Sequence, residues 1–137
     1  MSAAATPDGF VPVDTGNGFS NALGGLYIDR ARQRLGFRCG TDQCNPVGTC
    51  HGGAIATFAD TQIIAINPAS EARTEHHPTI NLSVDFISHI GVGDWVDSEV
   101  TVDRRSNSLL FTRAVMRVAD RIVARASAIY RIRDAIR

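Results

Sequence analysis

The chain contains no lysine and carries no net charge, because 14 arginines balance 14 acidic residues. Nucleic acids and anionic membrane surfaces attract an excess of positive charge, so neither is expected as the main partner. No apolar run approaches the ~20 residues that span a bilayer. No basic and apolar leader segment opens the sequence, and a cytoplasmic location is therefore expected.

Cysteine is also scarce. Cys39, Cys44 and Cys50 are odd in number and form no Cys-x-x-Cys pair, so neither a disulfide framework nor a zinc site is indicated. Reduced thiols in the cytosol are the simpler interpretation. Cys50 precedes His51 at the start of an expected helix, which leaves a cysteine nucleophile as an alternative.

One segment combines histidines with an acid. His76 and His77 follow Glu75 in a polar connection. Adjacent side chains rarely converge on one metal ion, and no third ligand is suitably spaced, so we expect no metal site.

The length of 137 residues fits a single domain with one core. Residues 1–21 are rich in Ala, Gly, Pro, Asp and Asn without a period, which predicts an N-terminal arm. Residues 22–137 are expected to form the domain.

A helix is predicted over residues 52–66. Asn45 and Pro46 begin turn chemistry that ends in a glycine pair, and no further breaker occurs before Asn67. Apolar residues recur at helical spacing and fill most of the circumference, so the helix should be buried on nearly all sides. Asp60 would then cost several kcal/mol to desolvate unless it has a partner, and its presence calls for a reason.

Strands are predicted on both sides of this helix. Two short ones precede it, and four longer ones follow, at residues 24–30, 33–38, 79–86, 95–105, 109–118 and 122–132. Four successive strands with short links imply an antiparallel meander that curls around the helix. The expected class is α+β.

The two ends of the helix suggest chemistry. Gly52 and Gly53 let a ligand approach the unpaired N–H groups and the positive end of the helix dipole, as in an oxyanion hole. Asp60 is available as a nucleophile on a carbonyl or as a general base on water. Together they indicate cleavage of an ester or thioester.

The run Asn-x-x-Gly-Thr-x-His-Gly-Gly at residues 45–53, with an Asp eight residues after the first glycine of the pair, resembles a known family. It is similar to the hot-dog-fold acyl-CoA thioesterases, in the PaaI-like (phenylacetate-degradation) branch of the 4-hydroxybenzoyl-CoA thioesterase superfamily. The resemblance covers roughly residues 20–133. It implies an antiparallel sheet wrapped around one long buried helix.

The resemblance also implies roles in hydrolysis of an acyl-CoA to a free acid and coenzyme A. The Gly52 N–H polarises the carbonyl, Asn45 positions the carbonyl or the nucleophile, and Asp60 attacks or activates water. Ser88 orients that water. The sequence departs from the family where Ser88 is followed by His89 instead of the usual Pro-Ala pair, so either side chain is a candidate for the site.

Supporting roles follow from the same resemblance. His51 and Gly53 shape the loop, while Arg104, Arg105 and Ser106 lie in the region that contacts coenzyme A phosphates. No metal or redox cofactor is implied, and coenzyme A is part of the substrate.

Alternatives remain. Asn45 alone is a good turn former, and Asp60 alone is compatible with a buried structural acid. A non-catalytic domain that binds acyl-CoA or an aromatic acid is the main alternative function, and a hydratase would need an Asp/His dyad before the helix. A small or aromatic acyl group is expected from the resemblance, with Phe58 and Ile63 as candidates to border a ring.

Distance predicts a homodimer. Gly52 and Asp60 are eight residues apart, which is roughly 12 Å along a helix, too far to act on one carbonyl. Two chains with antiparallel helices would bring the start of each helix to Asp60 of the other. The resemblance agrees, since such thioesterases form dimers with shared sites that often pair into tetramers.

Overall fold

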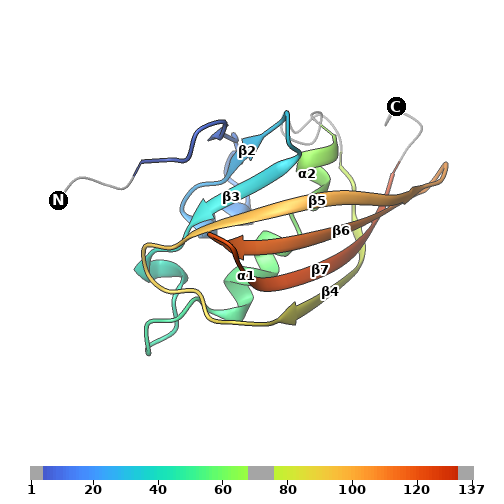
Figure 1. Cartoon of the computed structure of the whole chain (residues 1–137). Coiled ribbons are helices and arrows are strands. Elements are labelled where there is room, and N and C mark those ends of the chain that lie inside the picture. The colour runs from blue at the N-terminus through green and yellow to red at the C-terminus, as the bar shows by residue number, and fades with distance from the viewer. Residues whose placement is uncertain (1–4, 68–75, 133–137) are drawn as a thin grey trace.

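The computed structural model describes residues 5–67 and 76–132. Its described residues form a seven-stranded antiparallel sheet in the order β1-β2-β3-β5-β6-β7-β4 (Figure 1). The strands are β1 Val11–Pro12, β2 Tyr27–Asp29, β3 Arg34–Arg38, β4 Thr79–Phe86, β5 Trp95–Arg105, β6 Leu109–Val118 and β7 Arg121–Arg131. The helices are η1 Phe19–Leu23 and η2 Thr41–Gln43, both 3₁₀, followed by α1 Gly52–Ala59 and α2 Gln62–Ile66.

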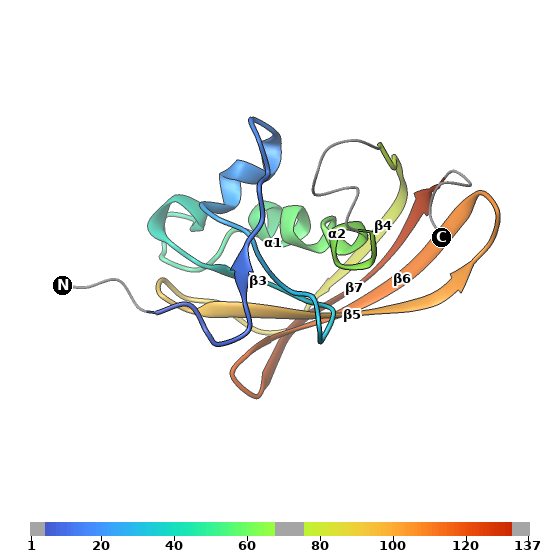
Figure 2. The same ribbon diagram turned by 90° about the horizontal axis from the view of Figure 1, so that it is seen from above.

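The sheet curls around α1 and α2, which lie on one of its faces (Figure 2). Alternate residues of the strands face these helices and form the main core with Ile55, Phe58 and Ala59 of α1. The strand residues in this core include Leu35, Phe37, Val96, Val100, Ala114, Met116, Val123 and Ala124. The predicted α+β class is confirmed. None of the described helices is long and apolar enough to cross a membrane.

The predicted helix differs from the structure in two details. It is interrupted at Asp60 and Thr61, where α1 ends and α2 begins. The side chains of Thr61 and Gln62 bind carbonyl oxygens of the last turn of α1, which makes the interruption locally stable. The helix is also not buried on nearly all sides, because the sheet covers one face only and leaves Gly53 exposed.

The expected meander of four strands is wrong. β5, β6 and β7 do follow one another, but β4 pairs with β7 at the edge of the sheet, from Thr79 opposite Tyr130 to Phe86 opposite Ala124. The segment between β4 and β5 is bound to Val123 by backbone hydrogen bonds, and it carries the chain across so that β5 pairs with β3. The outer edge of β4 has no partner strand among the described residues.

Part of the predicted N-terminal arm joins the sheet. Val11 lies opposite Ile28 in the pairing of β1 with β2, and the neighbouring Phe10 and Val13 are buried. The apolar residues of this otherwise polar arm therefore pack against the protein, and β1 pairs with the edge that β2 would otherwise leave open.

Candidate functional site

The turn before α1 is organised by Asn45. Its Oδ1 accepts hydrogen bonds from the backbone N–H groups of Val47 and Thr49, at 3.1 and 3.3 Å, and its Nδ2 donates to the Thr49 hydroxyl at 2.8 Å. Gly48 completes the turn with a φ of 86°. Both polar atoms of the Asn45 side chain are therefore used within its own turn, and a direct contact with substrate stays a prediction.

The first turn of α1 leaves one backbone donor open. His51 caps the helix, since its Nδ1 accepts the Gly53 N–H at 2.8 Å, and its carbonyl accepts the N–H groups of Ala54 and Ile55. No acceptor among the described residues takes the Gly52 N–H. The Gly52 N–H is the donor that the sequence predicts for an oxyanion. The cap by His51 fixes the backbone of the first turn, in which this N–H lies.

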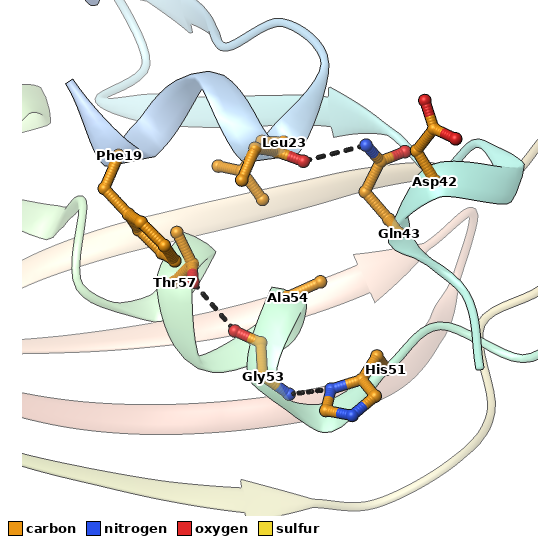
Figure 3. Close-up of a pocket in the computed structure, with 9 residues that line it drawn as sticks. Phe19, Leu23, Asp42, Gln43, His51, Gly53, Ala54 and Thr57 are labelled. Carbon is orange, nitrogen blue, oxygen red and sulfur yellow. Dashed lines mark hydrogen bonds between the residues drawn. The ribbon is translucent and has the colours of Figure 1, made fainter.

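The His51 side chain also lines a pocket on the surface of the protein. The pocket has a volume of about 290 Å³, and Asp42, Phe19 and Thr57 line it together with His51; Figure 3 shows these side chains. In the part of the chain that the structure describes, no hydrogen bond joins Asp42 to His51, and Nδ1 of His51 is occupied by Gly53. The Asp/His dyad of a hydratase is therefore not formed here.

Gly52 opens into a pocket of about 310 Å³ that also contains Ser88 and His89. The Ser88 hydroxyl donates to the Ile122 carbonyl at 3.1 Å and accepts from Arg121 Nη1 at 2.7 Å. Arg121 also donates to the His89 carbonyl at 2.7 Å. Apolar side chains complete the lining, among them Ile55, Phe86, Ile87 and Ile90. The structure thus brings the predicted oxyanion donor together with Ser88 and His89.

Asp60 lies elsewhere. It is half-buried and lines a separate pocket of about 380 Å³ with Phe19, Ala56 and Leu82. Burial raises the pKa of its carboxyl group above the ordinary value of 3.8, and the hydrogen bond from Thr79 and the nearby hydroxyl of Tyr130 offset part of that increase. Within one chain, neither Gly52 nor Ser88 lines the pocket of Asp60.

Thr79 is one residue of the candidate site that the sequence analysis missed. Its hydroxyl donates to Asp60 Oδ1 at 2.8 Å. In the sequence it is one of several polar residues that alternate along a strand, and nothing marks it as different from Asn81 or Ser83. Thr79 could have been identified only if the start of β4 had been known to lie beside Asp60 at the end of α1.

The arginines predicted to bind phosphate lie at the end of β5. Arg104 and Arg105 are exposed, and among the described residues neither guanidinium group makes an ion pair or a hydrogen bond. The Ser106 hydroxyl accepts from the Leu109 N–H at 3.0 Å and closes the turn into β6. Their contact with coenzyme A stays a prediction.

The three thiols lie together and are free. Cys39 Sγ is 3.5 Å from Cys44 Sγ. Burial raises the pKa of the Cys50 thiol, which disfavours the thiolate that a cysteine nucleophile requires. Within residues 5–67 and 76–132, no group of three His, Cys, Asp or Glu side chains is placed to hold a metal ion. His77 bonds to Asn67, whereas Glu75 lies outside the described residues.

Comparisons with known proteins agree on a family. A model of the thioesterase superfamily matches residues 47–125. A Pseudomonas aeruginosa protein that carries the name of an esterase is 29% identical over 129 residues, 92% of this chain and 96% of that protein.

Solved structures show the same fold. A variant of the phenylacetic acid degradation protein PaaI from Thermus thermophilus matches with a TM-score of 0.61, at 19% identity over 72% of this chain and 82% of that one. A hypothetical thioesterase from Streptococcus pneumoniae, solved with coenzyme A, matches with a TM-score of 0.62, at 16% identity over 72% and 75%. The predicted hot-dog fold is therefore confirmed.

The raised pKa of Asp60 predicts a pH-dependent stability difference between the wild type and Asp60→Asn. The folded chain holds the proton more tightly than the unfolded chain, so wild-type stability falls as pH rises from about 3.8 through the folded pKa. The asparagine side chain of the variant keeps an oxygen that accepts the hydrogen bond from Thr79, but it has no ionisable group. The melting temperature of the wild type minus that of the variant should therefore be lower at pH 7 than at pH 3.5, and an equal difference at both pH values would contradict the shift.

Proposed function

Because this chain belongs to the thioesterase superfamily, we propose that it hydrolyses an acyl-CoA thioester to a free acid and coenzyme A in sites shared by two chains. One observation carries the proposal. An open backbone donor at Gly52 and a half-buried carboxylate at Asp60 lie at opposite ends of α1, in pockets that one chain does not connect.

Strand β4 supplies a way to join the two pockets. Thr79, at its start, contacts Asp60, whereas Phe86, at its end, lies against Gly52, where an added Cβ would be 3.6 Å from the ring. If two β4 strands pair antiparallel along their free edges, the start of each meets the end of the other. Asp60 of one chain then approaches the Gly52 pocket of the other chain, giving two composite sites per dimer.

The side chains on β4 support this pairing. Ile80 and Phe86 are 56% and 58% exposed in the single chain, and a second copy would cover them. The second chain of the dimer would also cover the face of α1 around Gly53, which is exposed in the single chain. Further association of dimers into a tetramer is part of the proposal.

The chemistry follows from this arrangement. The Gly52 N–H binds the thioester carbonyl oxygen and, with the positive end of the α1 dipole, stabilises the oxyanion that forms on addition. Asp60 acts as nucleophile or as general base on water, and the Thr79 hydroxyl beside it is placed to orient that water. With Asp60 as general base, a C–O bond forms between water and the carbonyl carbon, the C–S bond breaks, and the proton taken from water passes through Asp60 to the coenzyme A thiolate. With Asp60 as nucleophile, the C–S bond breaks as the carboxylate forms an anhydride with the acyl group, and water then cleaves the anhydride to the free acid, restores the carboxylate and supplies the proton of the thiol.

The pocket of Asp60 is proposed to hold the acyl group. Phe58 and Ile63, expected from the sequence to border a ring, are 1% and 8% exposed and pack in the core instead. Phe19, at 79% exposed, takes that place beside Asp60. A flat aromatic ring in the lining of a pocket of about 380 Å³ favours a small or aromatic acyl group.

The alternative of a non-catalytic binding domain fits less well. A domain that only holds an acyl group gains nothing from a half-buried carboxylate in the lining of the pocket, because its burial costs free energy. The free arginines at residues 104 and 105 serve either function, since both need to contact coenzyme A phosphates.

Thiol release from a panel of short, long and aromatic acyl-CoAs tests the function. The wild type should release thiol, and Asp60→Asn should lower kcat/KM by about 100-fold or more, because the variant loses a general base or nucleophile. Asp103→Asn, an exposed acid on β5 paired with Arg113, is the matched control and should be unchanged. An inactive wild type across the whole panel would favour the binding domain.

Substitution of Phe19 tests the acyl pocket. Phe19→Ala should lower kcat/KM about tenfold for phenylacetyl-CoA or benzoyl-CoA and little for acetyl-CoA, since only an aromatic acyl group contacts the ring. Val92→Ala removes an exposed apolar side chain away from this pocket and serves as the control. Equal losses on all substrates would argue against a contact between Phe19 and the acyl group.

Complementation tests the shared site. Asn45→Ala, which releases the turn before Gly52, and Asp60→Asn should each be nearly inactive. When the two proteins are unfolded, mixed in equal amounts and refolded, half of the dimers are mixed, and each mixed dimer has one intact site. Activity should return toward about a quarter of wild type, whereas a mixture as inactive as its parents means that each chain builds its own site.

A further inference from the structure

Tyr130 on β7 reaches into the interruption between α1 and α2. Its side chain is almost fully buried, at 1% exposed, and its hydroxyl donates to the backbone carbonyl of Asp60 at 3.1 Å. The backbone of Gln62 and Ile63, at the start of α2, lies next to the same hydroxyl group. The hydroxyl thus occupies the gap where the helical hydrogen-bond pattern is broken.

The other contacts at this break are local. The Thr61 hydroxyl binds the carbonyl of Phe58 at 2.6 Å, and the Gln62 amide binds that of Ala59 at 2.9 Å, each three residues back. Tyr130 is 70 residues away in sequence and belongs to the sheet. The break is therefore anchored to the sheet through this hydroxyl.

The sheet register makes the anchor specific. Thr79 and Tyr130 lie directly opposite each other on β4 and β7. Thr79 binds the carboxylate of Asp60, and Tyr130 binds its carbonyl. One pair of facing residues thus holds both the side chain and the backbone of the proposed catalytic acid.

We propose that Tyr130 is a positioning residue for Asp60: by binding the Asp60 carbonyl, its hydroxyl fixes the direction of the carboxylate and so the hydrogen bond that the carboxylate accepts from Thr79. The proposal rests on the role of Asp60 in thioester hydrolysis. Tyr130 is too deeply buried to touch the substrate, so it acts only through Asp60.

The electrostatic surroundings of Asp60 are simple. Burial raises its pKa, and the hydroxyl groups of Thr79 and Tyr130 lower it; no charged side chain of the described residues contributes. Burial also raises the pKa of Tyr130 above its usual value near 10, so its hydroxyl keeps its proton and remains a donor. Loss of the Tyr130 hydroxyl should loosen the backbone of Asp60 and, with it, the hydrogen bond from Thr79 to the carboxylate, so the carboxylate should become easier to protonate.

The first test is Tyr130→Phe, which removes one oxygen atom. The acid limb of the kcat profile should move to higher pH, and kcat at neutral pH should fall several-fold with little change in KM. Tyr27→Phe on β2, where the ring packs on Trp95, is the matched control and should leave the limb in place. A lower melting temperature with an unmoved acid limb would mean that Tyr130 is structural only and would overturn the proposal.

The second test does not depend on turnover. The chain has two tyrosines, so 3-fluorotyrosine incorporated into Tyr27→Phe labels Tyr130 alone. Its ¹⁹F resonance should titrate with the ionisation of Asp60, and the transition should vanish in Tyr27→Phe/Asp60→Asn. A resonance that stays constant between pH 4 and 8 overturns the proposal.

The two tests separate this proposal from the proposed function. A wild type that releases no thiol from any acyl-CoA removes the proposed function, whereas the fluorine titration still decides whether Tyr130 senses Asp60. An active wild type with a silent fluorine label removes the positioning role alone.

Discussion

The carboxylate of Asp60, half removed from water, is the constraint on which the rest of the site depends. A charge in that position needs a donor that faces it, and the sheet supplies one through the Thr79 hydroxyl, while Tyr130 holds the backbone carbonyl of the same residue. The interruption of the helix at this residue lets both contacts form at once. The same sheet strands also cover the apolar face of α1, so the core and the site are fixed by one packing arrangement.

Most of the fold could be predicted from the sequence. The turn at Asn45, the glycine pair and the apolar period predict α1 at its observed start, and alternation predicts six of the seven strands at or near their observed positions. The place of β4 beside β7 could not be predicted, because pairing between distant strands is decided by packing over the whole sheet. The short β1 was also missed, since a two-residue strand carries no period.

The residues of the candidate site could be picked out from the sequence more readily than their geometry. The motif at residues 45–60 identifies Gly52 and Asp60, and the structure gives each a pocket. It does not identify Thr79 or Tyr130, because their importance comes from a register between strands that lie about fifty residues apart in the sequence. Asn45 is the opposite example, because the motif marks it as a site residue, whereas in the structure both polar atoms of its side chain form hydrogen bonds within its own turn.

The free edge of β4 has a consequence for how the protein behaves on dilution. An unpaired strand with exposed apolar side chains is a template on which other chains can add. In the proposed dimer the same strand aligns the two halves of each site, so separation of the chains removes catalysis and uncovers an aggregation-prone edge in one event. Selection for turnover and selection for solubility would then act on the same eight residues of β4.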